Sequence, residues 1–429
     1  MNILRSKNVK NAGWLIAGKV IQSVLALVIN TLTARYLGPS GFGIISYAAS
    51  IVAFVVPIMS LGFTNVLVQE FTNYPEEEGK ILGTSILLSC LSGLACIVGV
   101  FVFTLVANPG EVQTTIVCVL YSIMLIFQAT EMIIYWFQYK LLSKYTAIVS
   151  LCAYLVVSGY KIFLLATSQD VTWFAISYSI DYCIISLALF FIYKKLGGKN
   201  FSFSVDVAKR MFSRSKFYIL SGLAVVVYAQ TDKVMLKIMM GDTETGLYTA
   251  AVTTAGMISF VYSAIIDSLR PTIFEHKKNE DIEGYEKKVI LLYNIIVYLS
   301  LIQSVAMTIL APLLIKILYG SAYQFSVSAL QIIVWYTTFS YYGGAKDVWI
   351  LGEGKQKYLI WLNACGAIMN VIINFILIPI WGINGAAIAS LITQIFTNII
   401  MLIIIKPLRR NQKLLLKALN PKVLFSLFK

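Results

Sequence analysis

Apolar runs of about 20 residues recur along the whole chain, separated by short polar segments. Each run is long enough to cross roughly 30 Å of hydrocarbon as a helix. Helices are required because lipid cannot satisfy free backbone groups. The expected spans are Ala12–Arg35, Phe42–Val68, Ile81–Val106, Val112–Phe137, Thr146–Ala166, Thr172–Tyr193, Lys216–Met240, Leu247–Ile266, Val289–Leu310, Phe325–Ile350, Tyr358–Ile380 and Ile383–Ile405. The predicted fold class is therefore an all-α membrane protein of about twelve transmembrane helices.

Composition supports a membrane environment and excludes several kinds of chemistry. Hydrophobic residues make up 59% of the chain and charged residues 13%, whereas a soluble domain carries roughly 25% charged residues. All six cysteines fall inside expected spans without a CxxC pair, so we interpret them as small buried residues and expect no metal site. The single histidine, His276, lies in a charged loop, which leaves little for histidine-based catalysis.

The net charge of +14 could suggest a nucleic-acid partner, but its distribution indicates a membrane instead. If the N-terminus is cytoplasmic, 27 of the 34 Lys and Arg residues lie on the cytoplasmic side, three at the outer ends and four within spans. This asymmetry is a strong positive-inside signal. We therefore expect a multi-pass membrane protein with both termini in the cytoplasm and no nucleic-acid partner.

The segments between spans are too small for a separate catalytic domain. The outer loops are only a few residues long, and no GxxxxGK[ST] nucleotide-binding motif is present. The tail, residues 407–429, alternates basic residues with leucines, as in an amphipathic helix on the anionic inner leaflet. A disordered basic tail is the alternative.

The two halves of the chain repeat. Gly38-Pro-Ser-Gly-Phe-Gly43 and Gly241-Asp-Thr-Glu-Thr-Gly246 each open a span, at an offset of 203 residues. Further on, Trp136, Lys144 and Tyr145 match Trp349, Lys357 and Tyr358 at an offset of 213 residues. Six spans per half predict parallel repeats. We expect two pseudo-symmetric six-helix lobes, residues 1–200 and 201–406, around a central cleft, as in alternating-access transporters.

Three signatures resemble a known family. Ala34-Arg-Tyr-Leu-Gly-Pro-Ser-Gly-Phe-Gly43 with Leu61-Gly62, and Gln230-Thr-Asp-Lys233 with Gly246-Leu-Tyr248, are similar to motifs of bacterial polysaccharide (O-antigen type) flippases. Gly382-Ile-Asn-Gly385 is a third match. The resemblance covers nearly the whole chain and places it in the superfamily of multidrug, oligosaccharidyl-lipid and polysaccharide exporters.

The resemblance implies a transporter rather than an enzyme. Its substrate would be an oligosaccharide repeat unit on undecaprenyl diphosphate, translocated from the inner to the outer leaflet by alternating access. It also implies a location in the bacterial plasma (inner) membrane, and contact with membrane lipids and with polysaccharide polymerase machinery. Because sugar-contacting positions vary within that family, no sugar-binding residue is transferred to this chain.

Charged residues inside spans are the best candidates for a substrate pathway, since each costs about 2.5–3.5 kcal/mol at a helix centre. A lipid diphosphate needs cations to offset its desolvation, so the candidate substrate-binding residues are Lys19, Arg35, Lys161, Lys233 and Lys346. Candidates for coupling to H⁺ or Na⁺ are Glu131, Asp181 and Asp232. No other cofactor and no catalytic residue is expected.

Each candidate also has a purely structural interpretation. Lys233 and Lys346 could pair with Asp232 or Asp347 to hold helices together, and Arg35 could extend to the outer interface. The three acids, and Asn363, Asn370 and Asn374, could form interhelical hydrogen bonds. Among 25 tyrosines no single one, such as Tyr228, is informative as a sugar-stacking residue.

Two other functions compete with a flippase. A multidrug or cation antiporter of the same fold predicts an acid-dominated cleft, whereas five of the nine charges within or near the spans are basic. An integral-membrane sugar polymerase or transferase predicts a large loop or a cluster of catalytic side chains, and the sequence has neither. The sequence therefore favours the flippase.

Overall fold

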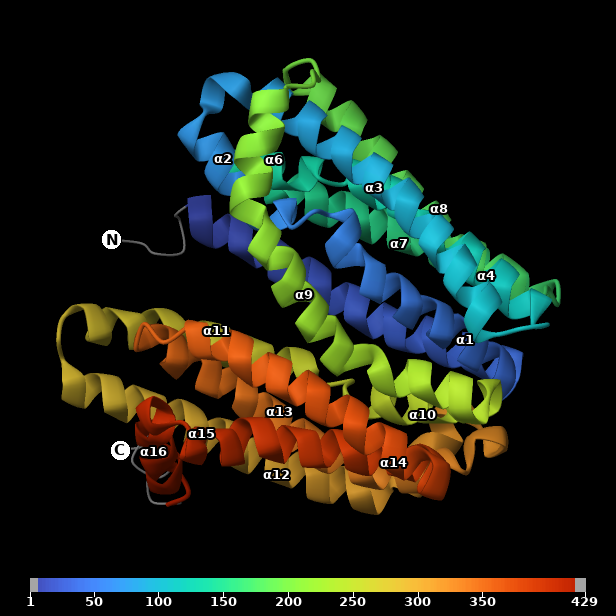
Figure 1. Cartoon of the computed structure of the whole chain (residues 1–429), viewed down its shortest axis with the longest axis vertical. Coiled ribbons are helices and arrows are strands. Elements are labelled where there is room, and N and C mark those ends of the chain that lie inside the picture. Colours follow the sequence, from blue (N-terminus) through green and yellow to red (C-terminus); the bar gives the residue numbers. More distant parts are fainter. Residues whose placement is uncertain (1–6, 421–429) are drawn as a thin grey trace. The chain divides into compact units, whose positions relative to one another are not determined.

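The computed structural model describes the backbone of residues 7–420 and the side chains of residues 22–420 other than residue 24. Within these residues every regular element is a helix (Figure 1). The chain divides into two compact units at Val226/Val227, within helix α9 (Val205–Met240). The lobes expected from the sequence divide 26 residues earlier, at residue 200.

The first unit contains eight α-helices before α9. They are α1 (Lys7–Met59), α2 (Leu67–Asn73), α3 (Glu78–Ala107), α4 (Val112–Ser122), α5 (Met124–Thr130), α6 (Ile133–Tyr139), α7 (Ser143–Ala166) and α8 (Val171–Lys195). Helix α1 doubles back at Gly38, whose backbone is not helical (Figure 1). The second expected span was wrong at its end, because α1 stops at Met59 and Leu61 and Gly62 turn the chain with positive φ.

The first part of α9 and the segment before it pack closely on the rest of this unit. A Cβ at Gly62 would lie 2.5 Å from the carbonyl oxygen of Ser215, and one at Gly83 would lie 2.4 Å from that of Ser202. The hydroxyl of Ser215 donates to the carbonyl of Leu61 over 2.7 Å. These approaches explain why residues 201–226 belong to the first unit.

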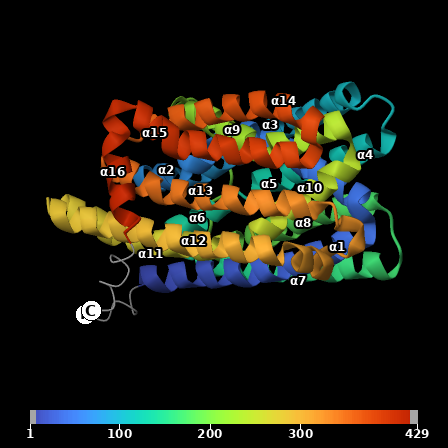
Figure 2. The same ribbon diagram turned by 90° about the horizontal axis from the view of Figure 1, so that it is seen from below.

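The second unit contains the rest of α9 and seven further α-helices. They are α10 (Asp242–Ala255), α11 (Ser259–Lys278), α12 (Ile282–Tyr319), α13 (Ser326–Gly352), α14 (Lys357–Ile395), α15 (Met401–Ile404) and α16 (Arg409–Ala418). Helix α14 doubles back at Gly382, and residues Phe396–Ile400 after it form a π-helix. Figure 2 shows the same elements from below.

Eight described helices are long and apolar enough to span a membrane, and α10 with α11, bent by 42°, form a ninth candidate. Helices α1 and α14 each contain two expected spans, since each is folded at a glycine. Helix α13 has the length of a span, but Lys346 and Asp347 reduce its apolar character. The protein is thus a multi-pass all-α membrane protein, and the count of twelve stays a prediction.

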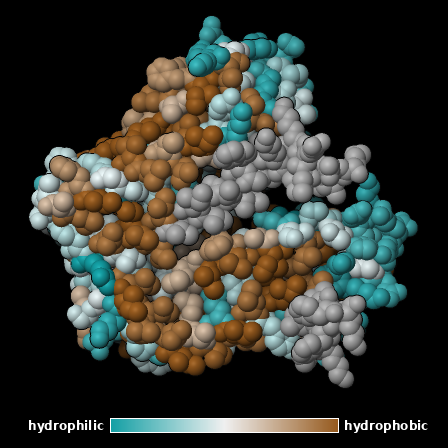
Figure 3. All heavy atoms as spheres, turned by 180° about the vertical axis from the view of Figure 1, so that it is seen from behind, coloured by the Kyte–Doolittle hydropathy of each residue, from teal (hydrophilic) through white to brown (hydrophobic). Residues whose placement is uncertain are grey.

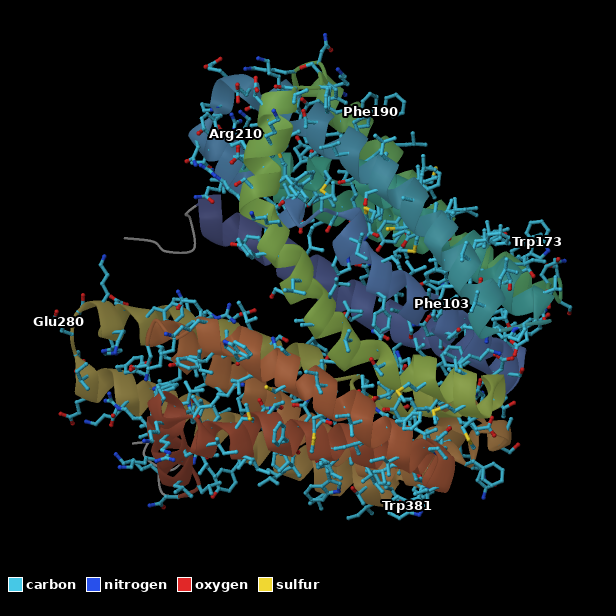
Figure 4. The ribbon with its side chains drawn as sticks, in the orientation of Figure 1. Phe103, Trp173, Phe190, Arg210, Glu280 and Trp381 are labelled. Atoms are coloured by element: carbon cyan, nitrogen blue, oxygen red, sulfur yellow. The ribbon has the colours of Figure 1, made fainter. Side chains whose placement is uncertain are left out.

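The surface agrees with this assignment. Apolar residues cover most of the flank of each unit in Figure 3, and hydrophilic residues gather toward the helix ends. Trp173 and Trp381, both about half exposed, project outward near helix ends that we expect to face outside (Figure 4). Tryptophan is enriched at membrane interfaces.

The tail is helical over Arg409–Ala418 and docks on the second unit. Asn411 accepts a hydrogen bond from Tyr342 (2.7 Å) and donates one to Tyr293 (2.5 Å). Arg410 pairs with Glu286 at 2.7 Å. Lys413 and Leu416 on the opposite side are exposed, so contact of this face with lipid stays a prediction.

The sequence repeat has a structural counterpart. Trp136 and Trp349 are both buried, each with a lysine ammonium near its ring. Lys144 and Lys357 each lie over the ring of the following tyrosine, at 4.8 and 5.3 Å. The two matched tryptophans are thus both buried, and the two matched lysine–tyrosine pairs have the same cation–ring contact.

Candidate functional site

The first unit contains a cavity of about 250 Å³ lined by Glu131, Gln128, Tyr135, Asn65 and Tyr218, among others. Glu131 lies in the break between α5 and α6, where the helical hydrogen-bond pattern is interrupted. The Oε1 atom of Gln128 is buried without a hydrogen-bond partner. The cavity therefore presents a carboxylate and an unsatisfied acceptor within a largely apolar bundle.

Lys161 and Asp181 lie together in the same unit. The Lys161 ammonium is 4.1 Å from the ring centroid of Tyr178, and only 5% of the residue is exposed. It interacts electrostatically with Asp181, whose charge also acts on Glu131. Three candidates from separate segments of the unit, Glu131, Lys161 and Asp181, thus form one electrostatic group.

Asp232 in the second unit is held by three donors, one on α10 and one on each arm of the folded helix α14. It accepts hydrogen bonds from the Tyr248 hydroxyl (2.7 Å), the Asn374 amide (2.6 Å) and the Ser390 hydroxyl. All four side chains are buried. The Oδ1 atom of Asn374 has no hydrogen-bond partner. Asp232 therefore lies among polar, oxygen-bearing side chains within the bundle. These surroundings suit either an acid that holds helices together or an acid that binds a cation.

A row of buried polar side chains continues from this site along the chain: Ser390, Thr393, Gln394, Thr397 and Asn398. Asn398 lies in the π-helix and donates to the Gln394 side chain over 2.5 Å. π-helical turns in α-helices frequently mark functional sites.

Lys346 faces the end of this row. Its ammonium donates to Asn398 Oδ1 over 3.0 Å and pairs with Asp347 Oδ1 at 3.1 Å. Lys346 is 4% exposed, whereas the Asp347 side chain is 46% exposed. A cavity of about 130 Å³ borders these residues. Lys346 therefore lies beside a small polar cavity, already paired with an acid.

The remaining candidates have different surroundings. The Lys233 ammonium donates to the Gln230 side chain over 3.3 Å, next to Asp232 in sequence. Arg35 is exposed, close to the turn at Gly38. The Lys19 side chain lies outside the described residues, although its backbone belongs to α1. No group of three or more His, Cys, Asp or Glu side chains that could hold a metal occurs in the described part of the chain.

Several residues of these sites were not among the sequence candidates, namely Tyr248, Ser390, Gln394 and Asn398. Their signal is visible afterwards as polar residues at intervals of four on an otherwise apolar helix: 390, 394 and 398. Such spacing places side chains on one helix face. Which helix that face meets cannot be read from the spacing.

Three comparisons relate the chain to known proteins. It matches the family model "Polysaccharide biosynthesis protein" over residues 8–277. A putative O-antigen transporter of Shigella flexneri is 19% identical over 92% of this chain and 96% of its own length. An uncharacterized membrane protein of Methanocaldococcus jannaschii is 23% identical over 52% of this chain, which spans only 45% of that relative.

Solved structures share the fold. The lipid II flippase MurJ, in an inward closed conformation, aligns with a TM-score of 0.73 at 15% identity, over 97% of this chain and 93% of that one. An inward-facing multidrug resistance MATE family transporter of the MOP superfamily aligns with a TM-score of 0.67 at 16% identity, over 91% and 96%. The chain thus has the fold of MOP superfamily transporters.

Proposed function

Since the chain belongs to the polysaccharide biosynthesis protein family, we propose that it is a flippase for an undecaprenyl-diphosphate-linked oligosaccharide. It carries an O-antigen or other polysaccharide repeat unit from the inner to the outer leaflet of a bacterial plasma membrane. The observation that carries this proposal is the alignment with nearly the full length of a putative O-antigen transporter. The shared fold with a lipid II flippase is consistent with it.

The cations support an anionic head group as cargo. Two negative charges on a diphosphate are costly to desolvate unless positive groups accompany them. Lys233 is suited to this role because its ammonium donates to a neutral amide at 3.3 Å, while Asp232 beside it accepts from three other side chains. Lys19, Arg35, Lys161 and Lys346 are the other candidates for contact with the substrate, through its diphosphate or its sugars. Lys233→Ala should abolish export, and Lys233→Arg should retain part of it.

Asp232 is our candidate for coupling to H⁺ or Na⁺, with Glu131 and Asp181 as alternatives in the first unit. A buried carboxylate next to the unpaired Asn374 oxygen can take up a proton or a small cation. Asp232→Asn keeps the size of the side chain and removes the charge. Export by this variant should fall and lose its dependence on Na⁺ or pH. Full export with an unchanged ion dependence would exclude Asp232.

Deletion of the gene in its bacterial host tests the function. Without it, surface polysaccharide should disappear and the lipid-linked repeat unit should accumulate in the inner leaflet, and the wild-type chain should restore both. Susceptibility to cationic drugs should not change. Unaltered polysaccharide with increased drug susceptibility would instead indicate a drug antiporter.

A further inference from the structure

The small cavity beside Lys346 combines several polar side chains within one unit of the bundle. Its lining residues are Tyr228 of α9, Lys346 and Asp347 of α13, Asn363 and Gln394 of α14, and Asn398 of the π-helix that follows α14. Its volume is about 130 Å³, and on this scale roughly 10–15 Å³ is enough to hold one water molecule. The cavity therefore has room for about one sugar ring, but not for a repeat unit.

The charges at this cavity cancel. The Lys346 ammonium lies 3.1 Å from the Asp347 carboxylate, and the pair contributes one positive and one negative charge. An added phosphate would have to compete with Asp347 for Lys346. The hydroxyl group of an uncharged ligand can both donate and accept hydrogen bonds. It can therefore accept from Lys346 and donate to Asp347 without separating the pair.

The amide groups are held in fixed orientations. Asn398 donates to Gln394 Oε1 (2.5 Å) and to the carbonyl of Phe339 (3.2 Å), and its own Oδ1 accepts from Lys346 (3.0 Å). The Asn398 side chain packs against Gly343, where a side chain would not fit. A Cβ atom at position 343 would lie only 2.9 Å from the amide nitrogen and oxygen of Asn398. Preorganised polar groups next to an aromatic ring, here that of Tyr228, are typical of small-molecule sites.

We propose that this cavity binds an uncharged sugar residue of the carried oligosaccharide, and that it does not bind the diphosphate. Hydroxyl or acetamido groups of the sugar bond to the Lys346–Asp347 pair and to the amides, and the ring packs on Tyr228. This inference rests on the proposed flippase function. Lys346 and Asn363 each lie six residues from a helix end that we expect to face the cytoplasm, so the sugar is recognised on the loading side.

Binding to the purified full chain in lipid nanodiscs tests the proposal. The probes are the methyl glycosides of glucose, galactose and N-acetylglucosamine, and sodium pyrophosphate, each read as a shift in the thermal unfolding midpoint. At least one glycoside should stabilise the wild-type chain. Asn398→Leu should remove that stabilisation and leave any effect of pyrophosphate unchanged. Gln303→Met, which alters a buried amide on α12 outside the cavity, is the matched control.

Charge variants separate a sugar site from an anion site. Lys346→Gln and Asp347→Asn should each weaken glycoside binding about tenfold or more, since each removes a charged hydrogen-bonding partner. The double variant, which lacks both charged partners, should bind the glycoside no better than either single variant. If Asp347→Asn instead strengthens pyrophosphate binding and Lys346→Gln abolishes it, the cavity is an anion site and the proposal is wrong. Absence of glycoside binding to the wild-type chain also overturns it.

Transport measurements separate the claim that the cavity binds a sugar from the claim that the chain is a flippase. Asn398→Leu should reduce transport of the lipid-linked oligosaccharide in vesicles. Normal transport by a folded Asn398→Leu chain would overturn the sugar site and leave the flippase function intact. A wild-type chain that binds glycosides but moves no lipid-linked oligosaccharide would count against the flippase function itself.

Discussion

At the scale of single residues, Gly38 and Gly241 have the same backbone conformation at corresponding places in the two halves. Their φ and ψ angles are 66° and 178° for Gly38, and 102° and −172° for Gly241. Only glycine adopts this region without strain. Gly38 has open space around it, so the backbone conformation, not crowding, requires the glycine.

Gly38→Ala and Gly241→Ala should therefore each destabilise the protein, by about 1–3 kcal/mol. Gly99→Ala is the control, because Gly99 lies inside α3 with open space around it, and alanine favours a helix. The thermal unfolding midpoint in detergent measures the effect. The explanation would be contradicted if the Gly38 and Gly241 variants unfolded at temperatures as high as the Gly99 variant does. The backbone conformation would then not require glycine at these two positions.

The sequence alone identified the charged residues that lie inside membrane spans. It did not identify the side chains that form hydrogen bonds with them. Asp232 stood out because an acid inside a span is costly. Its partners Asn374 and Ser390 are 142 and 158 residues away, and only the packing of helices brings them together. Likewise, the sequence allows Lys346 either to pair with an acid or to contact the substrate, and the structure pairs it with Asp347. The hydrogen bond from Lys346 to Asn398 was not predicted.

At the scale of elements, α2 is tied to α9 by buried charges (Figure 4). The Glu70 side chain is fully buried, and its two oxygens pair with Arg210 (2.9 Å) and Arg214 (2.7 Å). Arg210 also pairs with Glu77 at 2.6 Å and lies over the ring of Tyr74. This network fixes the start of α9 on α2 and on the turn that follows α2.

Arg210→Ala should lower the free energy of unfolding by about 3 kcal/mol, because it leaves a buried carboxylate with one partner fewer. Lys199→Ala should have an effect of about 0–1 kcal/mol, since Lys199 and Glu76 form an exposed pair. Thermal unfolding of both variants gives the comparison. Equal losses would show that the Glu70 network contributes no more than a surface ion pair.

A second charge cluster, at the end of α13, predicts a dependence on pH. Burial alone would raise the pKa of Glu353, but the hydrogen bond and charge of Lys277 and the charges of Lys355 and Arg410 outweigh it, and the pKa of Glu353 is lowered. Lys277 donates to the carboxylate over 2.7 Å. A lowered pKa means that the carboxylate stabilises the fold above its unfolded-state value of about 4.3, and that this stability is lost as the pH falls through the lower folded value.

Glu353→Gln should thus lower the unfolding midpoint at neutral pH, and the difference from the wild-type chain should shrink in acid. Unfolding curves recorded from neutral pH downward measure this difference. A difference that stays constant below the ordinary glutamate pKa would mean that Glu353 acts through packing and not through its charge.

Most helices follow from hydrophobic runs, but the joins between them do not. The sequence predicted separate spans on either side of Gly38 and of Gly382, and the structure joins each pair through a single non-helical glycine. The close packing of residues 200–226 on the rest of the first unit depends on Gly62, Gly79 and Gly83, whose missing side chains make room for backbone atoms. Such contacts between distant segments leave no periodic signal in the sequence.

At the scale of the whole molecule, the orientation in the membrane rests on the distribution of Lys and Arg. A reporter active only in the cytoplasm should be active when fused after Lys199 or Lys278, and silent after Pro109 or Trp381. Pro109 and Lys199 lie in loops, Lys278 is the last residue of α11, and Trp381 directly precedes the non-helical Gly382 at which α14 folds back. The opposite result at any of the four positions would refute the twelve-span topology.

The central claim, that the chain moves a lipid-linked oligosaccharide, is tested most directly in proteoliposomes. Undecaprenyl-diphosphate-linked oligosaccharide is placed in both leaflets, and a membrane-impermeant enzyme labels the sugar exposed outside. Vesicles with the wild-type chain should allow label to reach molecules that started in the inner leaflet, whereas protein-free vesicles should label only the outer leaflet. Identical labelling with and without the protein, under imposed Na⁺ and pH gradients, would contradict the flippase function.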